Sequence, residues 1–271
     1  MSYKVARGGL LTILAISIIV PVLVVLLGTF KTMEQLFASP FGLPKSWTLH
    51  NYVEVLTQYN MGQSFINSTI VTVSSVVLTL LISSMAAYGL SRLRGWKSVV
   101  IFGFLVIGMS VPAQANMIPQ YVLFSRLGLL NNLSGLVLIE VVTGIPVATF
   151  IMGGFMKTLP HEMFEAASVD GVGPVRAYYT VAVPLSGPAI AAAAIFLFVI
   201  QWNDLLYPLL FIQSTDKQTI PLRLLGFQGE FLTNYPLLFT GVAIASIPLT
   251  IAYVLLQRYF VEGLASGAVK G

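Results

Sequence analysis

Residues that could carry out chemistry are few in this sequence. Its two histidines, His50 and His161, are far apart, and no group of His, Asp and Glu has the spacing of metal ligands. Cysteine is absent, so the chain has neither a disulfide nor a thiolate metal site. No glycine-rich loop followed by Lys and Ser or Thr is present to hold a nucleotide phosphate. The sequence therefore predicts no catalytic residue and no metal on this chain, and it argues against an enzyme.

A polar stretch at residues 157–183 lies between two apolar segments and predicts a docking loop. Pro160 suits a first helical turn, and Gly171 suits the left-handed turn that ends a helix. Gly173-Pro174 then begins a second short helix, so the two helices form a compact knob with a glycine elbow. The knob offers small, apolar and acidic side chains, for burial or for pairing with a basic partner: Met163, Phe164, Glu165, Ala166, Ala167 and Asp170. The alternative is a loop that merely folds back on the helix ends.

Glu140 and Asp204 are the acids closest to the expected membrane interior, where ionisable groups face a cavity or the protein interior. Either acid could contact a solute, or make a structural hydrogen bond instead. Binding a sugar requires aromatic faces and hydrogen-bonding groups, and five further residues are of the right type: Asn67, Gln201, Trp202, Asn203 and Tyr207. Aromatic residues at a membrane interface usually serve as anchors, so these remain candidates for a substrate pathway.

The elements that position these residues are apolar helices. Hydrophobic residues make up 56% of the 271 positions and charged ones only 9%, far below the roughly one quarter of a soluble domain. Uncharged runs at 8–30, 55–91, 98–125, 177–203 and 231–257, with a sixth at 127–156 interrupted by Glu140, are each long enough to span a bilayer. We expect an all-α integral membrane protein with six transmembrane helices, because unpaired backbone groups are not tolerated in lipid.

Lys and Arg in the loops indicate the orientation. Nine fall on one side of six threaded helices: Lys4, Arg7, Arg92, Arg94, Lys97, Lys157, Arg176, Arg258 and Lys270. Five fall on the other side: Lys31, Lys45, Arg126, Lys217 and Arg223. Both termini are therefore predicted to be cytoplasmic. The net charge of +4 follows from this asymmetry and is no argument for nucleic-acid binding.

We divide the chain into a tail with the first helix (1–30), an external loop (31–62), a core with five helices (63–257) and a cytoplasmic tail (258–271). The core includes the loop 157–183 and an external loop at 212–236. The second helix, about 63–90, carries a stripe of small hydroxyl residues for helix packing or for a water-accessible path: Ser68, Thr72, Ser75, Thr79 and Ser83.

The middle helices contain several expected interruptions. The third helix, about 98–116, should break at Pro112 and Pro119, and a re-entrant or interfacial helix is expected at 118–132. The fourth, about 134–156, should bend near Pro146. The fifth, about 184–211, should hold Trp202-Asn203-Asp204 within it.

The spacing of the polar stretch resembles a known signature. Glu165-Ala166-Ala167, three residues, Gly171, nine residues, and then Val181, one residue and Val183-Pro184 is similar to the "EAA" motif of ATP-binding-cassette (ABC) importer permeases. Val181 and Val183 stand where Ile and Leu are commoner. The resemblance extends to Trp202-Asn203-Asp204, to Ile247-Pro248 and to the ending at 257–271, which look like the MalG-type permease of the di- and oligosaccharide branch.

This resemblance implies a type I ABC importer permease fold in the cell membrane of a prokaryote. It implies a sugar-transport subunit whose loop docks on a separate ATPase, through Met163, Phe164, Glu165, Ala166, Ala167, Asp170, Gly171 and Pro184. The partners would be a second homologous permease, two cytoplasmic ATPase subunits and an extracytoplasmic sugar-binding protein. ATP and Mg²⁺ would bind the ATPase, with no cofactor on this chain. In relatives, the tail also reaches the ATPase dimer interface.

Two alternatives stay open at the level of sequence. The same architecture could carry a non-sugar solute such as a polyamine, because the docking motif indicates contact with an ATPase and does not indicate which solute is transported. An ATP-independent secondary carrier is more remote, since no internal repeat is evident and Glu140 is the only ionisable candidate near the midplane.

Overall fold

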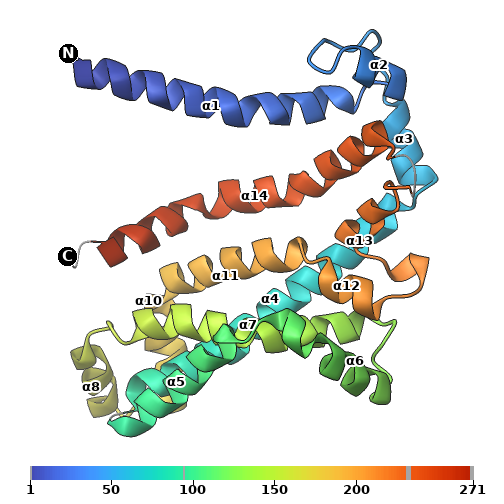
Figure 1. Cartoon of the computed structure of the whole chain (residues 1–271). Helices are drawn as coiled ribbons and strands as arrows, with labels where there is room; N and C mark the ends of the chain where they lie inside the picture. The colour runs from blue at the N-terminus through green and yellow to red at the C-terminus, as the bar shows by residue number, and fades with distance from the viewer. Residues whose placement is uncertain (1, 94, 230–232, 269–271) are drawn as a thin grey trace. The chain divides into compact units, whose positions relative to one another are not determined.

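The computed structural model describes residues 2–93, 95–229 and 233–268, and this part of the chain is built almost entirely of helices. An isolated bridge joins Gln228 to Thr233. The helices are α1 (Ser2–Gly28), α2 (Met33–Ala38), α3 (His50–Thr57), α4 (Met61–Arg92), α5 (Trp96–Ser110), α6 (Met117–Arg126), α7 (Leu133–Met156), α8 (His161–Val169), α9 (Pro174–Ala177), α10 (Val183–Leu185), α11 (Gly187–Trp202), α12 (Leu206–Phe211), α13 (Ile220–Leu225) and α14 (Tyr235–Ala268) (Figure 1).

The length and composition of these helices suit a membrane. Four described segments are long and apolar enough to span it: Ala6–Gly28, Met61–Arg92, Leu133–Met156 and Tyr235–Leu255. Two bent pairs raise the number to six if each pair is one span, namely Trp96–Ser110 with Gln114–Arg126 at 84° and Pro174–Leu185 with Gly187–Trp202 at 75°. The predicted all-α membrane fold is thus confirmed.

The chain forms two compact units, the first from Met1–Ile66 and Gln218–Pro248 and the second from Asn67–Lys217 and Leu249–Gly271. In the first unit, the predicted external loop 31–62 is an ordered cap with two helices. Asn51 Nδ2 donates to the carbonyl oxygens of Thr29 at 2.7 Å and Lys31 at 3.0 Å. The buried Lys31 Nζ donates to the Ser39 carbonyl at 2.8 Å. These bonds hold the chain where it leaves α1.

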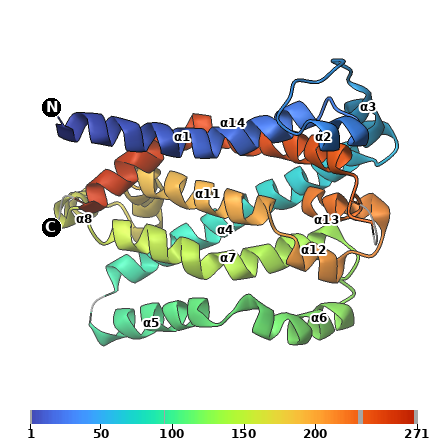
Figure 2. The same cartoon turned by 45° about the horizontal axis from the view of Figure 1, so that its top comes forward.

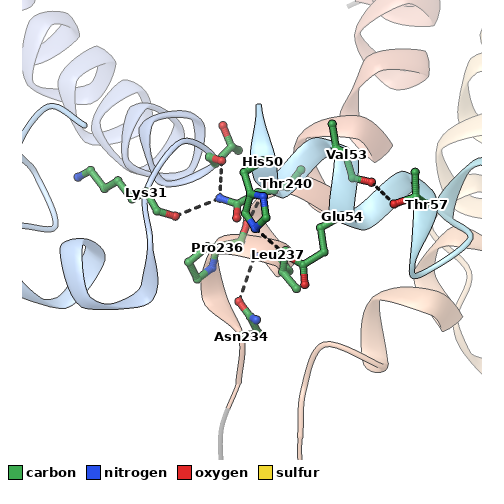
Figure 3. A network of polar contacts seen from close by, with 11 residues as sticks. Lys31, His50, Val53, Glu54, Thr57, Asn234, Pro236, Leu237 and Thr240 are labelled. Atoms are coloured by element: carbon green, nitrogen blue, oxygen red, sulfur yellow. Dashed lines mark hydrogen bonds and ion pairs between the residues drawn. The ribbon is translucent and has the colours of Figure 1, made fainter. Parts of the chain in front are cut away.

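Local polar contacts fix the two helix starts beside this cap (Figure 3). His50 Nε2 lies 3.4 Å from the Glu54 carboxylate, one turn along α3. Asn234 Oδ1 accepts a hydrogen bond from the Leu237 N–H at 3.3 Å, so its side chain caps the first turn of α14. Trp47 is 64% exposed, with its ring centroid 5.2 Å from that of Phe30.

In the second unit, α7 packs against α5, α11 and α12 (Figure 2). The hydroxyl stripe of α4 is fully buried, and Ser83 Oγ donates to the Ile145 carbonyl of α7 at 3.2 Å. A Cβ atom built on Gly144 would lie 3.1 Å from Thr79 Cγ2. The stripe is therefore a close-packing surface between α4 and α7, and small residues permit this approach.

Some predicted boundaries were wrong. Pro112 does end the third helix, but Pro119 lies in the first turn of α6, where a helix needs no N–H donor. The predicted fifth helix is three pieces: α10 ends before Ser186, α11 ends at Trp202, and α12 follows. Trp202 is therefore the last residue of α11, and Asn203 and Asp204 lie in the turn before α12 instead of within a helix. The last helix runs past its predicted end to Ala268, and 269–271 lie outside the described residues.

Candidate functional site

The predicted knob is present as two short helices with a glycine elbow. Helix α8 ends at Asp170, and Gly171 takes φ +76°, a conformation that costs glycine nothing and other residues more. Helix α9 then starts with Pro174 in its first turn. The chain continues through a π-helical turn, Tyr178–Ala182, into α10. The segment Pro174–Leu185, which includes α9 and α10, makes an angle of 75° with α11.

Aromatic side chains anchor the knob on α4. Phe164 is buried, with its ring centroid 6.2 Å from that of Tyr88. The Tyr88 hydroxyl donates to the Pro174 carbonyl at 3.1 Å, and the Tyr178 and Ser84 hydroxyls are hydrogen-bonded at 2.7 Å. Bonds at both of its helices therefore tie the knob to a single long helix.

Arg92, at the end of α4, adds a charge-based contact to this anchor. Its guanidinium carbon lies 4.4 Å from the centroid of the Phe164 ring, within the range of a cation–π interaction. Its Nη1 lies 3.1 Å from His161 Nδ1. Arg92 thus covers the ring that faces inward from α8.

The Glu-Ala-Ala and glycine part of the signature faces outward, whereas Val181 and Val183 are half-buried against the cluster of Phe164 and Tyr178. Glu165, Ala166, Asp170 and Gly171 are exposed, and Ala167 is half-buried. Met163, expected to be available for burial like Phe164, is 44% exposed. Helix α8 therefore uses Phe164 to pack on α4. Its outer face is narrow and acidic and includes the exposed Met163. Such a face suits docking against a basic or apolar partner groove.

A second polar cluster lies between α7, α11 and α12, in the half of α7 away from the knob. Asp204 Oδ1 accepts from the Leu206 N–H and Oδ2 accepts from the Tyr207 N–H, each at 3.2 Å. The side chains of Glu140 and Asp204 are hydrogen-bonded to each other. Burial raises the pKa of the Asp204 carboxyl above its ordinary value, while the bonds from Glu140, Leu206 and Tyr207 oppose that rise.

This cluster brings together four of the seven candidate pathway residues. Glu140, Gln201, Asp204 and Tyr207 line a common cavity of about 240 Å³. The structure separates the other three. Trp202 is buried and stacks on Phe198 at 5.6 Å between ring centroids, Asn203 is exposed and donates to the Val199 carbonyl at 2.8 Å, and Asn67 is buried and donates to the Asp216 carbonyl at 2.8 Å.

Several residues of both clusters were missed from the sequence. Tyr88 lies near the end of one uncharged run and Tyr178 near the start of another, and nothing in their spacing indicates that they lie close together. Gln114 and Thr143 line the cavity, and Gln120 accepts a hydrogen bond from the Tyr207 hydroxyl at 3.1 Å. Only the fold brings these groups together. Among the described residues, no group of three or more His, Cys, Asp and Glu could hold a metal ion.

Comparison with known proteins identifies the family. Residues 79–266 match the family described as "Binding-protein-dependent transport system inner membrane component". The chain belongs to this family. The match covers the second half of α4, the knob, the cavity and the last helix. The protein is accordingly a multi-pass membrane component of a transport system, and its match to the expected ABC permease family is confirmed.

Named relatives match over nearly the full chain. The diacetylchitobiose uptake system permease protein NgcG of Streptomyces coelicolor is 32% identical over 97% of this chain and 87% of its own. The melibiose/raffinose/stachyose import permease protein MelC of Bacillus subtilis is 32% identical over 97% of this chain and 95% of its own.

A solved structure supports the fold independently. It is a crystal structure of a bacterial ABC transporter involved in the import of the acidic polysaccharide alginate, with a TM-score of 0.82 and 22% sequence identity. The match covers 95% of this chain and 96% of that one. The fold is therefore that of an ABC importer permease.

Proposed function

We propose that this chain is the permease subunit of an ATP-driven sugar importer and that the knob couples it to the ATPase. The observation that carries the proposal is the division of the knob into two faces. Phe164 and Tyr178 tie it to α4, while Glu165 and Asp170 remain exposed. The names of the relatives, which refer to diacetylchitobiose and to melibiose, raffinose and stachyose, support a sugar as the solute.

The anchor gives a physical route for the coupling. A partner that moves the exposed face of α8 displaces Phe164 and the Tyr178 hydroxyl, and both act on the same end of α4. Helix α4 passes this movement to α7 through the buried hydroxyl stripe, because close-packed surfaces transmit displacement instead of absorbing it. Gly171, at the elbow, and Pro184, just after the π-helical turn, mark the two ends of the segment that would move.

The other subunits of the proposed importer are separate chains. A second homologous permease completes the pathway, two ATPase subunits bind ATP and Mg²⁺, and an extracytoplasmic protein delivers the sugar. No cofactor is expected on this chain. Both termini and the knob are cytoplasmic, as the excess of Lys and Arg in those loops indicates.

Affinity capture after extraction in mild detergent tests the coupling role. We expect an ATPase and a second permease to co-purify with the wild-type chain, and the ATPase to be lost with Glu165→Ala. Glu162→Ala is the matched control, because Glu162 is a second exposed acid on the same helix. It should leave the ATPase bound. Retention of the ATPase by Glu165→Ala, or its absence from the wild type, would contradict the proposal.

A further inference from the structure

The cavity between α6, α7, α11 and α12 has an unusual balance of hydrogen-bonding groups. Most of its wall is apolar, but six lining residues are polar: Gln114, Glu140, Thr143, Gln201, Asp204 and Tyr207. The described chain contributes no Lys, Arg or His to this wall. Its volume of about 240 Å³ is slightly below the roughly 300–1,000 Å³ of typical small-molecule sites, and therefore suits one end of a larger solute.

Gln201, one of the lining residues, has one buried acceptor without a hydrogen-bond partner. Its side chain is 94% buried, and its Nε2 donates to the Glu140 backbone carbonyl at 3.3 Å. Since that carbonyl only accepts, the amide orientation is fixed and Oε1 is the atom left over. Gln201 Oε1 is buried and has no hydrogen-bond partner. An unsatisfied buried polar atom costs about 1–3 kcal/mol, so a ligand that donates to it is favoured.

The two hydroxyl groups of the wall have already used their donors. The Thr143 hydroxyl donates to the Ile139 carbonyl at 2.9 Å, and the Tyr207 hydroxyl donates to Gln120 Oε1 at 3.1 Å. Both oxygens keep free lone pairs. Apart from the amide of the exposed Gln114, these groups present acceptors, so the wall favours a solute rich in donors.

The acid pair also has a definite arrangement of protons. A hydrogen bond between two carboxyl groups needs a proton on one of them, and both Asp204 oxygens already accept from backbone amides. Those amides stabilise the ionised form of Asp204. The shared proton therefore lies on Glu140, whose second oxygen is a further acceptor.

We propose that this cavity is a binding site on this subunit for one hydroxyl-bearing ring of a neutral sugar, with Gln201 Oε1 accepting from a sugar hydroxyl. Anions are disfavoured because no positive side chain lines the site. A neutral solute is favoured over an amine because Glu140 is already neutral and backbone amides offset the Asp204 charge. This inference rests on the proposed transport function and deepens it.

Sugar retention by the purified complex tests the site. Wild-type and variant complexes, with permeases and ATPases assembled in nanodiscs and trapped with ATP and vanadate, are incubated with radiolabelled raffinose, maltotriose or diacetylchitobiose, and with putrescine. We expect at least one sugar to bind and Gln201→Leu to weaken that binding about three- to tenfold, the loss of one hydrogen bond. Glu162→Gln, at an exposed acid of α8 that does not line the cavity, should bind within about twofold of wild type.

The outcomes separate this inference from the proposed function. An assembled complex that retains an ATPase but binds none of the sugars, or binds them equally well after Gln201→Leu, overturns the site and leaves the coupling role intact. Binding of putrescine that is lost in Glu140→Gln overturns the neutral-sugar assignment in favour of an amine. Failure of the ATPase to co-purify with the wild-type chain refutes the proposed function itself. Co-purification of the ATPase with each variant shows that it has folded.

Discussion

Replacing Gly144 by valine should loosen the contact between α4 and α7. A Cβ at this position would lie 3.1 Å from both Thr79 Cγ2 and Leu197 Cδ2, closer than ordinary van der Waals contact. The two extra methyl groups of valine must then displace side chains on two neighbouring helices. Overpacking of this kind costs about 1–3 kcal/mol.

Gly154→Val is the matched control, because Gly154 lies in the same helix and a Cβ there would meet no atom within 4 Å. Both variants carry the same change in helix propensity, so their difference isolates the packing cost. The assay is the thermal unfolding of the detergent-solubilised complex, in which Gly144→Val should melt several degrees below Gly154→Val. Equal melting temperatures would refute the view that the hydroxyl stripe is a close-packing surface.

Two further changes test the anchors of the second unit. Tyr178→Phe removes the 2.7 Å hydrogen bond to Ser84, so local opening of the knob should become easier by about 0.5–1.5 kcal/mol and amide hydrogen exchange in α8 and α9 roughly two- to twelvefold faster, as measured by mass spectrometry; unchanged exchange would show that the bond does not hold the knob. Asn131→Ala should lower the thermal stability by about 1–3 kcal/mol, because its Oδ1 accepts from the Gln213 N–H at 3.2 Å and from the Ser214 hydroxyl at 2.7 Å, and Asn131→Asp, which keeps an acceptor, should recover most of this loss.

Hydrophobic runs and the spacing of the polar stretch were sufficient to predict the spans and the knob. Both depend on local information: a bilayer sets the length of a span, and Gly171 and Pro174 each act within a few residues of themselves. The sequence also included Glu140, Gln201, Asp204 and Tyr207 among seven candidate pathway residues, chosen by residue type. These predictions required no knowledge of which helices touch.

Features that depend on the hydrogen bonds of single side chains, whether local or distant, were not predictable in this way. Helix α11 ends at Trp202 because the Asp204 carboxylate caps the next helix, a local competition that an apolar window does not reveal. The anchor joins Tyr88 to Pro174, and the cavity joins Gln201 to Glu140, each across more than sixty residues of sequence. A residue type alone does not indicate such partners.

The length of α4 turns the anchor into a lever. With 32 residues at 1.5 Å each, the helix is about 48 Å long, and the knob is fastened at its last turns. Under the proposed coupling, a tilt of about 5° about that end would move the other end by roughly 4 Å, so a small displacement at the knob would become a larger one across the membrane. Under that proposal, the size of the movement depends on the stiffness of α4. A flexible insertion in the middle of α4 would then separate movement of the knob from movement of the other end of the helix, without changing either end.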